Sequence, residues 1–302
     1  MNIIFFGTPE FSVQSLESLN KIPQINILSV ITQPDKKVGR KGILTPPPVK
    51  ICAQNLGLLV HQPKTKEEIF KIVKKYTADF FVVIAYGSIL DKKTLELPKY
   101  GAVNVHGSLL PKYRGASPIQ EALLNGDKET GLSIMSMNEK MDEGDIYFLK
   151  RVEIAKEDNY ISLSDKLAIV SANILPFLLE DIALGKLDKV KQNNKQATVC
   201  RKIEKEDGKI NFKTFTAEKI LNMIKAYTPW PTVYADIKGK KIQIIEAEES
   251  SGNLKPNEIS VENKTLKIGT KKGILMPSKV KIEGKSEMDI NSFLNGYKHL
   301  FN

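Results

Sequence analysis

Short apolar runs alternate with amphipathic stretches in the first part of the chain. The runs have the length of strands and lie at residues 2–6, 25–31, 79–85 and 102–106. Stretches with helical spacing lie between them at residues 47–56 and 67–76. After the first run, Thr8, Pro9 and Glu10 offer an N-cap, a proline at the first helical position and an acid in the first turn. This order predicts an α/β fold with a Rossmann-like, doubly wound parallel sheet.

The pattern changes twice beyond this sheet. Residues 132–137 and 146–154 are predicted strands, residues 161–183 a long apolar helix, and we end the first domain at residue 187. Residues 185–207 carry seven lysines and arginines against four acids with little apolar periodicity. This composition predicts an exposed basic linker over residues 188–206.

A second domain is predicted over residues 207–302. Its short β-prone runs lie at residues 233–237, 241–245, 265–268, 273–276 and 280–282. Helices are expected at residues 212–226 and 289–294, and the proline-rich residues 227–231 (YTPWP) cannot be helical. Short strands at near-regular spacing predict a small, OB-like β-barrel.

Length and composition agree with two folded domains. The chain has 302 residues, of which 41% are hydrophobic and 26% charged. The opening MNIIFFGTPEF lacks the basic start and the long apolar core of a signal peptide, so we expect a cytoplasmic protein that does not enter a membrane. Cys52 and Cys200 form no CxxC pair, and we expect both to be buried or incidental thiols. The net charge of +10 favours a polyanionic partner, although a solvated lysine coat gives the same number.

We look for candidate functional residues where the predicted strand 102–106 ends, because ligands bind beyond the carboxyl ends of such strands. Alternation along the strand puts Asn104 and His106 on one face. A lone histidine is more often structural than catalytic, but this one has an amide on the same face and a glycine- and proline-bracketed loop after it. Asp142 lies in an acidic loop between two predicted strands, and by spacing alone it is more often a solvated turn residue.

The sequence lacks the motifs that other common kinds of site require. The chain has no GxGxxG, no GxxxxGK[ST] and no HExxH, and its three histidines offer no obvious zinc ligand set. Ser108 in HGSLL lacks the GxSxG context of a hydrolase nucleophile. We therefore expect no metal.

The segment NVHGSLLPKYRGASPIQ, followed by MDEGDI, resembles the signature of the folate-dependent formyltransferases. In that family an Asn, a His and an Asp surround the formyl group, and they match Asn104, His106 and Asp142. The resemblance implies that Asn104 and His106 donate hydrogen bonds to an oxyanion, while Asp142 orients His106 and relays protons. It also implies that the folate pocket is lined by Ser108, Leu109, Leu110, Pro111 and the backbone near Tyr86 and Gly87.

Other segments resemble the branch of this family that acts on the methionine of charged initiator tRNA: FFGTPEFSV, TQPDKKVGRKGILTPPPVK, AYGSIL and TPWP. This resemblance implies that the chain transfers the formyl group of 10-formyltetrahydrofolate to that methionine, for translation initiation. We expect a monomer. It puts the basic loop 32–50 at the acceptor stem, with Arg40 and Lys41 near the terminal bases. By composition alone the loop is equally a mobile surface insertion.

Residues 264–285 hold seven lysines and one acid. They fit a second tRNA-binding face, with Lys271 and Lys272 on it. Two other functions stay open: a formyltransferase for a small amine such as a sugar nucleotide, and an RNA-binding module with a decayed formyl site. The basic second domain and the TPWP junction speak against the first, and the intact Asn104, His106 and Asp142 set speaks against the second.

Overall fold

The computed structural model describes residues 1–39, 42–297 and 300. The chain folds into two compact units, each built from several segments. The first contains residues 1–118, 129–153 and 164–200, and the second contains residues 119–128, 154–163 and 201–302. The segments 119–128 and 154–163, which the sequence analysis assigned to the first domain, thus cluster with the C-terminal residues.

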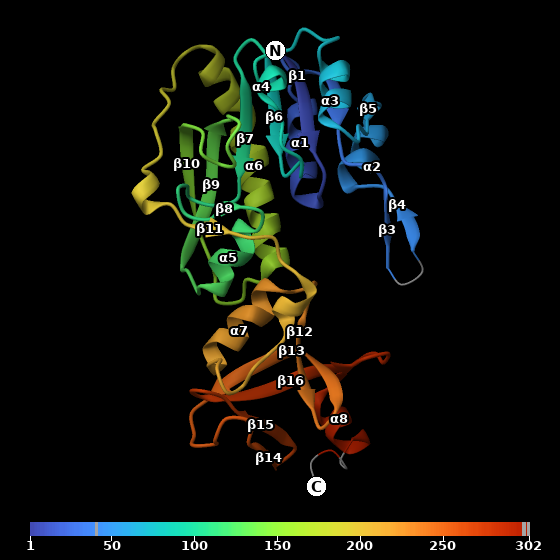
Figure 1. The fold of residues 1–302 in the computed structure, drawn as a ribbon, viewed down its shortest axis with the longest axis vertical. Helices are drawn as coiled ribbons and strands as arrows, with labels where there is room; N and C mark the ends of the chain where they lie inside the picture. Colours follow the sequence, from blue (N-terminus) through green and yellow to red (C-terminus); the bar gives the residue numbers. More distant parts are fainter. Residues whose placement is uncertain (40–41, 298–299, 301–302) are drawn as a thin grey trace. The chain divides into compact units, whose positions relative to one another are not determined.

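A seven-stranded sheet forms the centre of the first unit (Figure 1). Its order is β10 (Ile146–Glu153), β9 (Glu129–Ser136), β7 (Ala102–His106), β6 (Phe80–Ile84), β1 (Asn2–Gly7), β2 (Asn26–Ile31) and β5 (Val60–His61). The five strands from β7 to β5 are parallel, β9 pairs antiparallel with β7, and β10 pairs antiparallel with β9. The chain runs outward from β1 to β5 and returns to β6 on the other side of β1. This reversal confirms the predicted doubly wound sheet.

Both faces of this sheet are covered. On one face Ile4, Phe6 and Phe81 form a core cluster with residues of α3 (Lys66–Val73) and α4 (Lys92–Leu95). Ile3 and Phe5 point to the other face and are fully buried as well. Burial on both faces is the reason why these strands read as continuous apolar runs rather than as alternating ones.

Two helices that are far apart in the sequence are bound together in the first unit. The Ser15 hydroxyl of α1 (Val13–Asn20) lies 2.8 Å from that of Ser171 in α6 (Tyr160–Ala183). The Ser18 hydroxyl donates to the carbonyl of Ala172 at 2.7 Å. By length and composition α6 is apolar enough to cross a membrane, but half of its most apolar stretch is buried within the protein.

The turn after β1 differs from the prediction. Thr8 does not cap a helix, because Pro9 stands at the N-cap position of a short 3₁₀ turn, η1 (Glu10–Ser12), and α1 begins only at Val13. The Thr8 hydroxyl donates instead to the carbonyl of Tyr86 at 2.8 Å. Thr8 therefore ties the end of β1 to the loop that follows β6.

The basic loop 32–50 contains a hairpin of β3 (Lys36–Val38) and β4 (Ile43–Thr45), followed by α2 (Pro48–Asn55). Exposed Val38, Ile43 and Leu44 lie on this hairpin. At its base Lys50 Nζ lies 2.8 Å from a carboxylate oxygen of Asp35. The described part of the loop is thus a paired element, which the basic composition of the sequence did not indicate.

The second unit contains an antiparallel sheet, as its short β-prone runs predicted. Five strands follow the order β12 (Val233–Ile237), β13 (Lys240–Ser250), β16 (Ile274–Ile282), β15 (Thr265–Gly269) and β14 (Ile259–Glu262). β17 (Glu287–Asp289) pairs with β16, and α8 (Ile290–Gly296) follows it. The pairings among the described residues form an open path from β12 to β14, so closure into a barrel stays a prediction.

Two boundaries in this unit were wrong. The runs 273–276 and 280–282 are one strand, β16, whose pairing with β13 continues through Pro277 after register shifts near Glu246. The helix expected from residue 212 begins at Ala217, as α7 (Ala217–Ala226). Thr216 caps it, because its side chain accepts from the backbone N–H of Lys219.

Candidate active site

Asn104 and His106 lie at the carboxyl end of β7, as the sequence predicted. They are two residues apart on one strand, so their side chains leave the same face of the sheet. Asn104 is partly exposed, and its side-chain amide has no hydrogen-bond partner among the residues that the structure describes. The His106 side chain is only 6% exposed. The strand thus presents an available amide beside a buried imidazole.

The position of the His106 ring is fixed by the loop that follows its own strand. His106 Nε2 lies 2.9 Å from the carbonyl oxygen of Tyr113. A carbonyl can only accept, so Nε2 carries a hydrogen and donates it to Tyr113. The other nitrogen, Nδ1, is therefore the one that can accept or release a proton.

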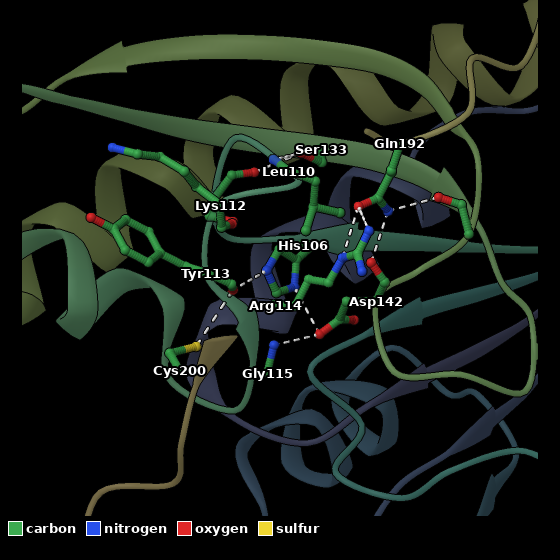
Figure 2. Close-up of polar contacts among 12 residues, drawn as sticks. His106, Leu110, Lys112, Tyr113, Arg114, Gly115, Ser133, Asp142, Gln192 and Cys200 are labelled. Carbon is green, nitrogen blue, oxygen red and sulfur yellow. Dashed lines mark hydrogen bonds and ion pairs between the residues drawn. The ribbon is translucent and has the colours of Figure 1, made fainter. Parts of the chain in front are cut away.

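Asp142 faces this nitrogen from the turn between β9 and β10 (Figure 2). Its Oδ2 lies 3.6 Å from His106 Nδ1 and accepts a hydrogen bond from the backbone N–H of Gly115 at 2.8 Å. The φ angle of Asp142 is 55°, in the left-handed region that aspartate tolerates better than most residues. The structure thus brings together the histidine and the aspartate that the sequence predicted.

Two residues that the sequence analysis did not select bind the Asp142 turn. Arg114, which is 7% exposed, donates from Nε and Nη2 to Oε1 of Gln192 at 3.0 and 2.7 Å. Gln192 Nε2 donates to the carbonyls of Asp142 and Gly144 at 2.7 and 2.8 Å (Figure 2). Arg114 lies inside the quoted signature, so a buried arginine there could have been suspected. No signal marked Gln192, which lies in the predicted linker.

The predicted folate-contacting loop is closely held at its centre. Ser108 is fully buried, and its hydroxyl donates to the carbonyl of Lys112 at 2.6 Å. The backbone N–H of Leu110 donates to the Ser133 hydroxyl at 2.9 Å. Leu110 packs in an apolar cluster with Met135 and Ile146.

The remaining predicted folate contacts are two residues of this loop, Leu109 and Pro111, and the backbone near Tyr86 and Gly87. Leu109 and Pro111 are partly exposed on the same loop. Tyr86 is 2% exposed, burial raises the pKa of its hydroxyl to about 12, and that oxygen has no partner among the described residues. Gly87 has a φ of 83°, and no atom lies within 4 Å of the place where a Cβ would stand. The backbone at Gly87 is therefore open to a ligand.

The predicted tRNA contacts are dispersed over the chain. Arg40 and Lys41 lie outside the described residues. Lys271 and Lys272 are exposed in the turn between β15 and β16 of the second unit. Their backbone is fixed there, because Lys271 donates to the carbonyl of Phe215 and Lys272 accepts from the N–H of Ala217, both at 3.0 Å.

Comparisons with known proteins agree with this fold. Residues 1–179 match the formyl transferase family, and residues 202–298 match the formyl transferase C-terminal domain. Within residues 1–39, 42–297 and 300 no group of three or more His, Cys, Asp or Glu side chains is placed to hold a metal ion. The fold and these family matches define a formyl transferase.

Full-length relatives narrow this class. The chain is 42% identical over 306 residues to the methionyl-tRNA formyltransferase of Caldicellulosiruptor saccharolyticus, covering 99% of this chain and 97% of the relative. It is 43% identical over 300 residues to that of Listeria innocua, covering 97% and 95%. The chain therefore belongs to the methionyl-tRNA formyltransferase family.

A solved structure shares the fold at low identity. It is the N-formyltransferase from Helicobacter canadensis in complex with folinic acid and dTDP-3-aminofucose. The TM-score is 0.67 at 20% identity, over 91% of this chain and 98% of that one.

Proposed function

We propose that this chain transfers the formyl group of 10-formyltetrahydrofolate to the amino group of methionyl-initiator tRNA, with Asn104, His106 and Asp142 around the reacting carbon. The proposal is supported by relatives of that name that match nearly the whole chain at 42 and 43% identity. One observation carries the residue roles: an amide without a hydrogen-bond partner among the described residues stands on the same strand face as a histidine whose Nδ1 faces a carboxylate. The cytoplasmic location and the monomeric state stay predictions.

The residues around β7 fit a reduced folate. The apolar cluster at Leu110, the partly exposed Leu109 and Pro111, and the open backbone at Gly87 combine apolar walls with main-chain groups, which suits a flat heteroaromatic ring. When bound, 10-formyltetrahydrofolate supplies a formyl group on a nitrogen leaving group. These residues would hold the ring at the end of β7.

Asn104 serves as a hydrogen-bond donor in this proposal. The primary amine of the acceptor is already a good nucleophile once deprotonated, so the chain needs no covalent intermediate. It must instead stabilise negative charge on an oxygen and move protons. A donor placed where that charge develops contributes about 3 to 4 kcal/mol in other enzymes.

His106 and Asp142 handle the protons. Because Nε2 of His106 is engaged by Tyr113, its Nδ1 is the nitrogen available for exchange, either with a reactant or through a water. Asp142 keeps this nitrogen oriented and stabilises the ring when both nitrogens are protonated. The hydrogen bond from Gly115 in turn fixes the Asp142 carboxylate.

The test replaces each of the three side chains. Asn104→Ala, His106→Ala and Asp142→Asn should each raise the barrier by about 2 to 4 kcal/mol, a loss of turnover of about thirty- to a thousandfold. Folate affinity by calorimetry should change little, because these groups act on the reacting atoms. The assay measures formylmethionine formed from 10-formyltetrahydrofolate and charged initiator tRNA. Near wild-type turnover in folded His106→Ala would reject the site, and wild-type activity on an amino sugar but not on tRNA would favour the small-amine alternative.

A further inference from the structure

A segment of the predicted linker is bound along the catalytic loops. We call residues 190–200 the strap. At one end Val190 and Ile146 exchange two backbone hydrogen bonds of 2.9 Å. At the other end β11 (Val199–Cys200) pairs in parallel with β8 (Arg114–Gly115). The strap therefore joins the loop after β7 to the turn between β9 and β10.

Thr198 strengthens the attachment to the loop after β7. Its hydroxyl accepts from the N–H of Tyr113 at 2.8 Å, and its backbone N–H donates to the carbonyl of Pro111 at 3.2 Å. Tyr113 is the residue whose carbonyl holds His106. The strap is thus fixed to the backbone that positions the histidine, although most of its side chains are exposed.

Gln192, near the start of the strap, uses its whole hydrogen-bonding capacity. Its Oε1 accepts twice from Arg114, and its Nε2 donates to the carbonyls of Asp142 and Gly144. A side-chain amide has two donors and two favourable acceptor directions, and all four are satisfied here. The opposite orientation would turn Nε2 toward the guanidinium and Oε1 toward two carbonyls. Arg114 therefore sets the direction in which Gln192 points its donors.

The turn that Gln192 binds needs such support. Asp142 is left-handed with φ at 55°, a conformation that costs some free energy even in aspartate, which tolerates it better than most residues. Two residues on, Gly144 packs so tightly that a Cβ would stand 1.7 Å from the carbonyl oxygen of Ser136. Gln192 bonds both of these residues and leaves the Asp142 carboxylate directed at His106.

We propose that Gln192, oriented by Arg114, is a positioning residue that holds the Asp142 carboxylate in register with His106. The inference rests on the proposed roles of His106 and Asp142. It assigns to the strap a function in turnover, beyond joining two parts of the chain. Without the bonds from Gln192 the turn still exists and Gly115 still donates to the Asp142 carboxylate, but the backbone that carries this carboxylate is held less firmly, so its distance from the imidazole is less well fixed.

Gln192→Glu tests this positioning role, because the substitution hardly changes the shape of the side chain. The new carboxylate can still accept from Arg114, but it turns an oxygen instead of an N–H toward the carbonyls of Asp142 and Gly144. Gln196→Glu is the matched control, because it makes the same chemical change four residues further along the strap at an exposed position. A misplacement of about 1 Å in a catalytic group can cost about a hundredfold in rate. We expect kcat of Gln192→Glu to fall by about ten- to a hundredfold on this scale, with KM for both substrates nearly unchanged.

Two readouts separate positioning from a loss of folded protein. The pH dependence of kcat should change in Gln192→Glu and not in Gln196→Glu, because the proton-transfer pair is altered only in the first. In an Asp142→Asn background Gln192→Glu should cause little further loss, since residues that act through one group are not additive. Gln192→Asn, whose shorter amide cannot span both sets of partners, keeps the test open if the Glu variant does not fold.

The outcomes are distinct for the two proposals. If Asp142→Asn is inactive while Gln192→Glu and Gln192→Asn both match wild type in kcat and pH profile, the positioning inference is overturned and the proposed site stands. Full multiplicative loss in the double variant also overturns the inference. If Asp142→Asn itself keeps wild-type turnover, the proposed role of Asp142 fails, and with it the basis of the inference.

Discussion

Individual side chains are fixed at both ends of the basic loop 32–50, and Asp35 is the clearest case. Its carboxylate accepts from Lys50 at 2.8 and 2.9 Å and from Gln62 at 2.7 Å. Gln62 also donates to the carbonyl of Gln33, whose side chain in turn donates to the Ser88 hydroxyl, each at 2.8 Å. A chain of hydrogen bonds from Asp35 through Gln62 and Gln33 thus links the base of the hairpin to Ser88, next to Gly87.

These partners predict how Asp35 contributes to stability as pH changes. Hydrogen bonds from Lys50 and Gln62 lower the pKa of Asp35 below its ordinary value. A carboxyl whose pKa is lowered by folding stabilises the protein above its unfolded pKa, about 3.9. That contribution disappears as the pH falls through the lower, folded value.

The difference in free energy of unfolding between wild type and Asp35→Asn should therefore be largest above about pH 5 and shrink below about pH 3.9. Urea unfolding at a series of pH values measures it. A carbon-detected titration of Asp35 that gave a pKa at or above the unfolded value would contradict the assignment.

The catalytic candidates were predictable from the sequence only in part. Alternation on a strand was enough to put Asn104 and His106 on one face, because strand geometry is local. Asp142 could be predicted only from its match to the family signature. The sequence of an acidic loop does not show whether its turn is left-handed and functional or an ordinary solvated turn. Gln192 could not be predicted at all, because its role depends on a strap that returns to the site after a helix of 24 residues.

At the scale of elements, β8 and β11 meet at a distance that only glycine allows. Gly115 has a φ of 124°, and a Cβ there would lie 2.0 Å from the carbonyl oxygen of Cys200. Its N–H is also the donor to Asp142. The strap and the site therefore depend on the same small residue.

Gly115→Ala should separate β11 from β8. We expect a loss of about 2 kcal/mol or more in stability, together with faster proteolysis at Lys191 or Lys195 of the strap. Gly296→Ala is the control: Gly296 ends α8, no atom lies within 4 Å of its Cβ position, and alanine favours a helix. Denaturant unfolding and timed trypsin digestion measure both effects. Equal stability and equal digestion rates for the two variants would show that the strap is not held through β8.

The elements that were predicted well are those with a strong local period. β7 and β12 have the predicted bounds, and α6 differs by one residue at its start. β14, β17 and the β3–β4 hairpin were missed because they are short and exposed, so their pairing is decided by partners rather than by their own pattern. The single strand β16 was divided in two because Pro277 usually marks an interruption, whereas β16 passes through it.

At the scale of the whole molecule, the chain carries ten more basic than acidic residues, and the arrangement of that charge matters more than its sum. Lys271 and Lys272 project from a turn whose backbone is hydrogen-bonded to Phe215 and Ala217 at the start of α7. Substituting their side chains should therefore leave the fold unchanged. This makes them suitable probes for the predicted contact with tRNA.

If Lys271 and Lys272 contact phosphates, tRNA binding releases counterions there and log affinity falls with log salt. Each lost contact should make that slope shallower by about 0.7 to 0.9, so Lys271→Gln/Lys272→Gln should reduce it by about 1.4 to 1.8. Initiator and elongator tRNA should weaken alike, since phosphate contacts carry no sequence information. Lys21→Gln, an exposed lysine after α1, is the control and should leave the slope unchanged. Fluorescence titrations at four or more salt concentrations give the slopes. An unchanged slope in the double variant would remove these lysines from the tRNA contact, and a slope near zero in the wild type would favour the small-amine alternative.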